Sequence, residues 1–217
     1  MKHVVKAKSP AGFEAWKSAI NDDWSPDYSS LRNPEKKALH QALLDEQGGV
    51  CCYCGRAISL EDSHIEHFRP QELREDLALD YTNLFASCIR ETKPGSPLHC
   101  GHAKGNLFDE ACHISPLDEN CERRFLYALN GAISPADLAD DAAKFMSQLL
   151  RLDIAFLRNR RAEVLASVFD PEFLATASDD ELRQLATAFN KPDVDGRLEG
   201  FAHVLSGYVK QLLTPVT

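Results

Sequence analysis

The segments Cys51-Cys52-Tyr53-Cys54-Gly55 and His64-Ile65-Glu66-His67-Phe68-Arg69-Pro70 decide the fold that we predict for this chain. Two later segments belong with them: Asp80-Tyr81-Thr82-Asn83-Leu84, which is followed by Cys88, and His99-Cys100-Gly101-His102-Ala103-Lys104-Gly105. Five of the seven cysteines and four of the eight histidines lie in this quarter of the 217 residues. Random placement would scatter them, so the clustering indicates one module organised by metal.

Four cysteines are the predicted ligands of a structural zinc ion. Cys51 and Cys54 form a half-site, because two intervening residues let both thiolates reach one tetrahedral ion at about 2.3 Å. Cys88 and Cys100 are the available second pair, and His99 in place of Cys100 is an open alternative. A lone Cys-x-x-Cys pair can also be redox-active, but no βαβ pattern surrounds this one, which favours zinc.

The segment between the half-sites carries groups that suit phosphodiester hydrolysis. We expect a strand that Pro70 ends, on which His64 and Glu66 share one face and His67 lies on the other. An imidazole takes a proton from water near neutral pH, because its ordinary pKa is about 6.5. A carboxylate holds a hard divalent ion that neutralises the departing oxyanion. The amide of Asn83 both donates and accepts, so it suits bracing of the loop that carries the histidine.

The order of these motifs resembles the HNH nuclease family, in which a hairpin and a helix, the ββα-metal fold, are clamped around one ion. The resemblance is closer still to one branch, the PtuB group of nuclease subunits in Septu-type and retron-associated anti-phage systems. Segments outside the central module share in it: Phe13-Glu14-Ala15-Trp16, Ser115-Pro116-Leu117-Asp118 and Cys121-Glu122-Arg123-Arg124-Phe125. It covers most of the chain and thins after residue 160.

The resemblance implies a role for each central residue. His67 resembles the general base, and Glu66, where the family usually has aspartate, resembles a ligand of the catalytic ion. Asn83 resembles the middle asparagine, which braces the loop and does not bind metal. The implied cofactors are a structural Zn²⁺ ion and a catalytic Mg²⁺ or other divalent ion.

The last HNH position is where this sequence departs from the family. Gly101 stands where Asn or His is usual, three residues before the Lys-Gly pair. We expect His102 to be the second ligand of the catalytic ion, with His99 as the alternative for this position. His64 is expected to bond a phosphate or to orient Glu66.

The predicted function is that of an HNH endonuclease, with DNA as the favoured substrate. The resemblance implies an effector of anti-phage defence that is controlled by a PtuA-like ATPase partner, with a retron reverse transcriptase and its RNA and DNA as further candidate partners. The formal net charge of −9 argues against tight autonomous binding to nucleic acid and fits recruitment by a partner. The alternatives are cleavage of RNA, including tRNA, and a non-catalytic zinc adaptor of the ATPase.

A cytoplasmic location is expected from the cysteines and from hydropathy. An odd number of clustered cysteines does not suit a disulfide framework and favours a reducing compartment. No run of 18 apolar residues predicts a membrane helix, and no apolar stretch follows the basic N-terminus as it does in a secretory signal.

The predicted fold class is α+β, with a zinc-bound ββα-metal core embedded in a mainly α-helical protein. Residues 1–50 are expected to form a helical, partner-contacting segment, residues 51–133 the zinc-stapled nuclease module, and residues 134–217 a helical region. Within the module we expect a helix that starts at Asp80 and runs through Cys88.

Local signals outside the central motifs predict further elements. Asn130-Gly131 predicts a hairpin turn. Helix-start signals at Pro10, Pro34 and Ser178 predict helices after them. Apolar residues at three-and-four spacing predict helices within residues 137–150, 154–169 and 200–213. The arginines at positions 158, 160 and 161 are expected on a solvated helix face, with a phosphate-contacting stripe as the alternative.

Overall fold

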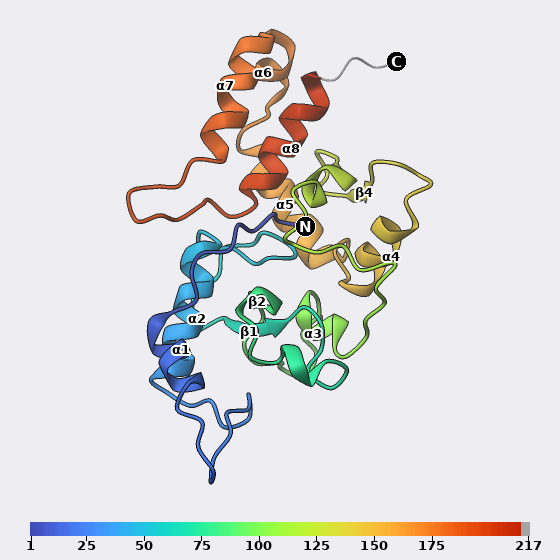
Figure 1. The fold of residues 1–217 in the computed structure, drawn as a ribbon. Helices are drawn as coiled ribbons and strands as arrows, with labels where there is room; N and C mark the ends of the chain where they lie inside the picture. The colour runs from blue at the N-terminus through green and yellow to red at the C-terminus, as the bar shows by residue number, and fades with distance from the viewer. Residues whose placement is uncertain (214–217) are drawn as a thin grey trace.

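The computed structural model describes residues 1–213 of the chain, and in this part helices surround two short antiparallel hairpins (Figure 1). The α-helices are α1 (Ala11–Lys17), α2 (Glu35–Glu46), α3 (Gly101–Lys104), α4 (Asp141–Leu149), α5 (Ala155–Ala166), α6 (Pro171–Thr176), α7 (Asp179–Phe189) and α8 (Ala202–Leu213). The strands are β1 (Ser63–His67), β2 (Leu84–Cys88), β3 (Phe125–Tyr127) and β4 (Ile133–Pro135). Short 3-10 turns are η1 (Glu75–Leu77), η2 (Tyr81–Asn83) and η3 (Cys121–Arg124). This mixture of helices and strands agrees with the predicted α+β class.

β1 and β2 form the central hairpin, with Ser63 opposite Cys88 and His67 opposite Leu84. The expectation of a helix from Asp80 through Cys88 is therefore wrong. Asp80 caps the short turn η2 instead, and the five residues of β2 that follow are all buried. A buried strand and a buried helix both appear in sequence as a short apolar run, so periodicity over five residues does not separate them.

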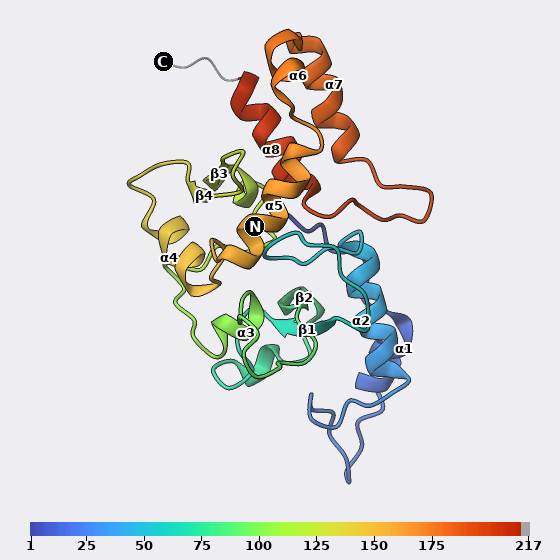
Figure 2. The same ribbon diagram turned by 180° about the vertical axis from the view of Figure 1, so that it is seen from behind.

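Helix α2 packs against this hairpin, and Figure 2 shows the helix alongside β1 and β2. Gln47 joins the two, because its Nε2 donates to Ala86 O over 2.9 Å and its Oε1 accepts from Ala86 N over 2.8 Å. Within α2, one turn after its start, Nε2 of His40 lies 2.9 Å from Oγ of Ser63. One side of α2 is thereby held over β1.

The first ten residues form an extended arm outside the strands and helices. Lys2 N donates to Cys52 O over 3.0 Å, and Val4 N donates to Pro116 O over 2.8 Å. Lys2 Nζ also pairs with Glu122 Oε1 over 2.7 Å. The arm therefore connects the first zinc half-site with the segment that precedes β3.

The second hairpin, β3 and β4, turns at Asn130-Gly131 as predicted. Gly131 has a φ of 77°, and a Cβ there would lie 1.9 Å from Arg158 O, so glycine is required.

The Gly131 carbonyl accepts from Arg161 Nε over 2.7 Å, and Arg161 is only 1% exposed. The expectation of a solvated face is wrong for Arg161, since its guanidinium holds the turn against α5. Arg158 is ion-paired with Asp153, and Arg160 is exposed.

The helices α5, α7 and α8 begin within two residues of their predicted starts, α4 begins at Asp141 and not at residue 137, and one helix is additional. Ser178 and Glu181 form a capping box at the start of α7. The six-residue α6 has no counterpart among the predicted elements. α8 packs on α7 and on β3, where Gln211 bonds both backbone groups of Tyr127 over 2.8 and 2.9 Å.

No helix within residues 1–213 has the length and apolar character that crossing a membrane requires. The domain boundaries after residues 50 and 133 stay predictions.

Candidate metal centre and active site

The four predicted zinc ligands converge on one point in the protein. The sulfur atoms of Cys51, Cys54, Cys88 and Cys100 all lie within 4.8 Å of one another, and all four residues are buried. Sγ of Cys88 is 3.6 Å from Sγ of Cys54 and 3.6 Å from Sγ of Cys100. A tetrahedral ion with bonds of about 2.3 Å places its sulfur ligands about 3.8 Å apart. The cluster therefore has the donor set and the spacing of a closed structural zinc site.

The surroundings of the cluster support this assignment. Cys88 N donates to Cys51 Sγ over 3.5 Å, the kind of bond that stabilises a thiolate ligand. His99, the alternative to Cys100, has its Nδ1 3.2 Å from Cys100 Sγ, and its ring stacks on Phe156. Since four sulfur atoms already meet without it, the structure favours Cys100 as the fourth ligand.

Glu66 is the centre of a second group of polar side chains, on β1 beside the zinc cluster. Its Oε1 is 2.9 Å from Lys104 Nζ and accepts from the Tyr53 hydroxyl over 3.1 Å. Its Oε2 is 3.2 Å from His64 Nε2. Burial acts to raise the pKa of Glu66, but the hydrogen bond with His64 and the charge of Lys104 outweigh it and hold that pKa below its usual value. Glu66 is thus a buried carboxylate that stays ionised.

The two imidazoles near Glu66 share a single backbone acceptor, the carbonyl of Ile89. His64 Nδ1 lies 2.5 Å from this oxygen and His102 Nε2 lies 2.9 Å from it. The two rings are tilted against each other with centroids 4.5 Å apart. Burial acts to lower the pKa of His64, but Glu66 outweighs burial and raises it. His102, the predicted ligand, thus contacts the His64 ring and the Ile89 carbonyl, and among residues 1–213 it makes no hydrogen bond with Glu66.

Gly101 begins the one-turn helix α3 at the position where the HNH pattern has Asn or His. A Cβ at Gly101 would lie 2.2 Å from Glu66 Oε2 and 2.8 Å from His64 Nε2. The backbone of α3 is therefore packed directly onto this pair, and the imidazole of His64 fills the space beside the carboxylate.

His67 lies on the other face of β1, as the alternation of strand residues predicts. Its Nε2 is 3.0 Å from Ala78 O, and its ring meets the ring of Tyr28 edge-on at 4.4 Å between centroids. A carbonyl only accepts, so Nε2 carries the proton and Nδ1 of the neutral ring keeps its lone pair. Burial lowers the pKa of His67 despite the bond to Ala78, which favours this neutral form.

Asn83 makes the contacts that bracing of the loop after β1 requires. Its Oδ1 accepts from Arg69 N over 2.8 Å. Its Nδ2 donates to Arg69 O over 2.9 Å and to Leu77 O over 3.2 Å. All of its amide contacts in the described residues are to backbone, and they fix the segment that follows His67.

Two residues of the site have no role in the sequence analysis, Lys104 and Tyr53. Lys104 is 2% exposed, and besides Glu66 it bonds the His67 carbonyl over 3.0 Å. It therefore joins the carboxylate to the end of β1. Both residues lie inside quoted motifs, Tyr53 between the first two zinc ligands and Lys104 in the Lys-Gly pair. Their position inside these motifs was the sequence signal that could have identified Lys104 and Tyr53 as site residues. A motif does not say, however, which carboxylate each side chain will contact.

At the level of class, the chain is a mixed helix-and-strand protein whose four-cysteine cluster fits a zinc-bound HNH-type core. No known family model matches the chain. Over 103 residues the chain is 30% identical to a protein of Vibrio cholerae serotype O1 biovar El Tor whose name describes a predicted HNH endonuclease of retron Vc95. The match covers 46% of this chain and 48% of that protein, so the chain spans about half the length of the curated relative that it matches. This similarity supports the HNH endonuclease family and a nuclease function.

Proposed function

We propose that the chain is a divalent-metal-dependent HNH endonuclease with a ββα-metal core made of β1, β2 and α3. The observation that carries the proposal is the Glu66 carboxylate: one oxygen is anchored by Lys104 and Tyr53, and the other faces an imidazole. The carboxylate and the imidazole are thus already placed as two ligands of a metal site, on a hairpin that the proposed zinc ion would hold together. DNA is the favoured substrate, and RNA is the alternative.

Glu66 and one imidazole would hold the catalytic ion, and the geometry favours His64 over the predicted His102. Without the ion, His64 Nε2 donates a proton to Glu66 Oε2, while Nδ1 faces the Ile89 carbonyl. A bound cation would replace that proton, since a metal ligand must be a neutral imidazole. Two acceptors 3.2 Å apart suit a shared cation, since ligands at about 2.1 Å and a right angle lie about 3 Å apart. His102 Nε2 instead contacts the Ile89 carbonyl. When bound, the ion would stabilise the charge that develops on the leaving oxygen.

His67 would act as the general base through Nδ1. Its Nε2 is held by the Ala78 carbonyl, so the ring is fixed in orientation and in tautomer. Asn83 supports this arrangement by fixing the loop that follows. Lys104 holds both the Glu66 carboxylate and the His67 carbonyl, so it keeps the two residues at a constant relative position.

The biological setting that we propose is anti-phage defence in the cytoplasm, in a Septu-type or retron-associated complex of the PtuB kind. The retron in the name of the relative supports this setting. The net charge of −9 supports control by an ATPase partner that recruits the nuclease to its substrate.

Hydrolysis of DNA by the zinc-loaded protein with Mg²⁺ or Mn²⁺, alone and with its co-purifying partner, tests the proposal. His67→Ala is expected to lower the cleavage rate by at least about 100-fold, the usual contribution of a positioned acid or base. Glu66→Gln is expected to abolish cleavage, because the catalytic ion loses its carboxylate ligand. Zinc content should match wild type in both variants, and His67→Ala should also keep the wild-type thermal unfolding. Glu66→Gln is expected to unfold at a lower temperature, because it leaves the buried Lys104 without its ionised partner. His3→Ala, on the arm, is the control. Cleavage of RNA alone would establish the alternative substrate. Cleavage that persists in both variants would refute the proposed site.

A further inference from the structure

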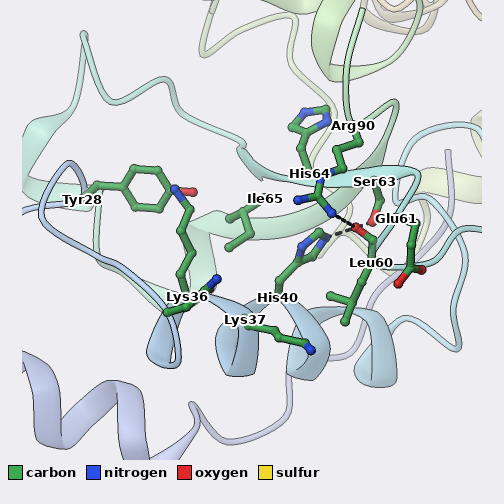
Figure 3. Close-up of a pocket in the computed structure, with 11 residues that line it drawn as sticks. Tyr28, Lys36, Lys37, His40, Leu60, Glu61, Ser63, His64, Ile65 and Arg90 are labelled. Carbon is green, nitrogen blue, oxygen red and sulfur yellow. Dashed lines mark hydrogen bonds between the residues drawn. The ribbon is translucent and has the colours of Figure 1, made fainter.

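A hollow of 480 Å³ lies between α2 and β1, next to the proposed active site. Figure 3 shows Tyr28 and Lys36 at one end of it, Leu60 and Glu61 at the other end, and Ile65, His40 and Arg90 between them. One wall comes from α2 and the other from β1 and the residue stretch just after β2. The hollow is therefore built jointly by the N-terminal segment and the hairpin.

The charges around this hollow are mostly positive, in a chain whose net charge is −9. Lys36, Lys37 and Arg90 line it, and Glu61 is the acidic residue among its lining side chains. Lys36 Nζ lies 4.8 Å from the centre of the Tyr28 ring. Lys37 makes no hydrogen bond or ion pair among residues 1–213, so its ammonium group is available to a ligand.

His40 lies in the middle of the hollow, where burial and then these charges act on its pKa. The Ser63 hydroxyl donates to Ser59 O, so it accepts from His40 Nε2. Burial, followed by the charges of His64, Arg90 and Lys36, lowers the pKa of His40 to about 4. An anion bound here would oppose these charges and raise that pKa.

The hollow touches both faces of the proposed active site. His64, whose Nε2 contacts Glu66, is one of its lining residues. Tyr28, another lining residue, packs against the ring of His67. A chain of phosphates in the hollow would thus pass beside both the metal-binding pair and the base.

We propose that this hollow binds the phosphate backbone of a nucleic-acid strand and leads the strand to His64. The inference rests on the proposed nuclease function and adds to it the surface that holds the substrate. Lys36 and Lys37 on the α2 wall and Arg90 on the opposite wall are spread along the hollow, and such spacing suits several successive phosphates better than one small anion. Contacts of this kind position a strand without reading its sequence, so binding should be independent of base order.

Binding of a fluorescently labelled single-stranded DNA oligonucleotide, measured by anisotropy without Mg²⁺ as salt is varied, tests the proposal. The double variant Lys36→Ala/Lys37→Ala is expected to bind about tenfold more weakly and to lower the salt slope by about 1.4, or 0.7 for each lost contact. The matched control is Lys144→Ala/Lys191→Ala, which removes the same charge from α4 and from the residue stretch after α7. The NMR titration of His40 should move to higher pH when the oligonucleotide is added.

The outcomes separate the two proposals. Equal binding by the wild type and the Lys36/Lys37 variant, or equal losses in both double variants, would overturn the strand site even if the protein cleaves DNA. Displacement of the oligonucleotide by inorganic phosphate at similar concentration would show a small-anion site and would also overturn it. If only the Lys36→Ala/Lys37→Ala variant binds the oligonucleotide more weakly, while the wild type hydrolyses no DNA, the strand site is upheld and the nuclease function is refuted.

Discussion

Gly101 lies so close to Glu66 that a methyl group on Gly101 would be 2.2 Å from the Glu66 Oε2 atom. The start of α3 and the carboxylate on β1 are thus in direct contact, with no room for a side chain between them. In the HNH pattern this is the place of a ligand side chain. Here the glycine leaves the space to His64, which comes from β1 itself.

Replacing Gly101 with alanine should disrupt the Glu66 pair while leaving the zinc cluster formed. The added carbon forces Glu66 or α3 to move, and overpacking of this kind costs about 1–3 kcal/mol of unfolding free energy. Urea unfolding measures the loss, and Mn²⁺ binding measures the damage to the site. Gly12→Ala is the control, because a Cβ at Gly12 meets nothing within 4 Å. Unchanged stability and Mn²⁺ affinity in Gly101→Ala would contradict the close contact.

His64→Ala and His102→Ala should differ in their affinity for the catalytic ion. Loss of His64 removes a proposed ligand, and we expect Mn²⁺ binding by zinc-loaded protein, followed by electron paramagnetic resonance, to weaken by about 100-fold. Loss of His102 removes a neighbour of His64, and we expect about tenfold or less. The opposite order would restore His102 as the second ligand and refute the assignment of His64.

Cys51→Ser should unfold the central hairpin, since structural zinc contributes on the order of 10 kcal/mol to folding of small metal-bound modules. We expect the zinc content to fall well below one ion per chain and circular dichroism to show lost structure. Cys112→Ser, outside the four-sulfur cluster, should keep both. A Cys51→Ser protein with full zinc and an unchanged unfolding midpoint would argue against the cluster as a zinc site.

Acid should weaken the anchorage of the N-terminal arm through Glu122. Burial acts to raise its pKa, but interaction with a protonated His203, the charge of Lys2 and the bonds to Lys2 and His3 lower this pKa from 4.5 to about 2. Because burial holds the pKa of His203 well below 6.5, its ring is neutral near neutral pH, and Lys2 is the lasting charge beside Glu122. A carboxyl with a lower pKa in the folded state stabilises above its unfolded pKa. This stability is lost as pH falls from about 4.5 to about 2, and it amounts to on the order of 2–3 kcal/mol.

Urea unfolding of wild type and Glu122→Gln at several pH values checks this prediction. The variant should be less stable at pH 6 and should lose less stability than wild type on acidification. Glu119→Gln, at an exposed neighbouring position, is the control and should behave as wild type. Parallel curves for wild type and Glu122→Gln would refute the role of Glu122.

The zinc cluster could be predicted from sequence because its requirement is local and chemical. Four thiols in two groups can share one metal ion in few other ways. The four sulfur atoms do lie together in the structure, from Cys51, Cys54, Cys88 and Cys100. The Asn130-Gly131 hairpin was accessible for a similar reason, since only a few residue pairs suit that turn. β2 was not accessible, because its short apolar run fits either kind of buried element.

The contacts of the site could not be predicted to the same degree. That Lys104, thirty-eight positions away, joins His64 in holding Glu66 ionised depends on how α3 packs against β1. The position of α2 over β1, which places Lys36 and Lys37 beside His64, depends likewise on tertiary packing such as the Gln47–Ala86 bonds. Sequence indicated which residues carry chemistry, and packing decided which of them meet.

The arm at residues 1–10 has a consequence for the order of events on the ribosome. Its partners Cys52 and Glu46 are translated soon after it, but Pro116 and Glu122 follow more than a hundred codons later, so docking of the arm cannot be completed until the hairpin with its four cysteines has emerged. Contacts so distant along the chain form late, because closing a long loop is slow. The four cysteines can therefore take up zinc before the arm makes its contacts with Pro116 and Glu122, and these last contacts would close the structure after the metal has been acquired.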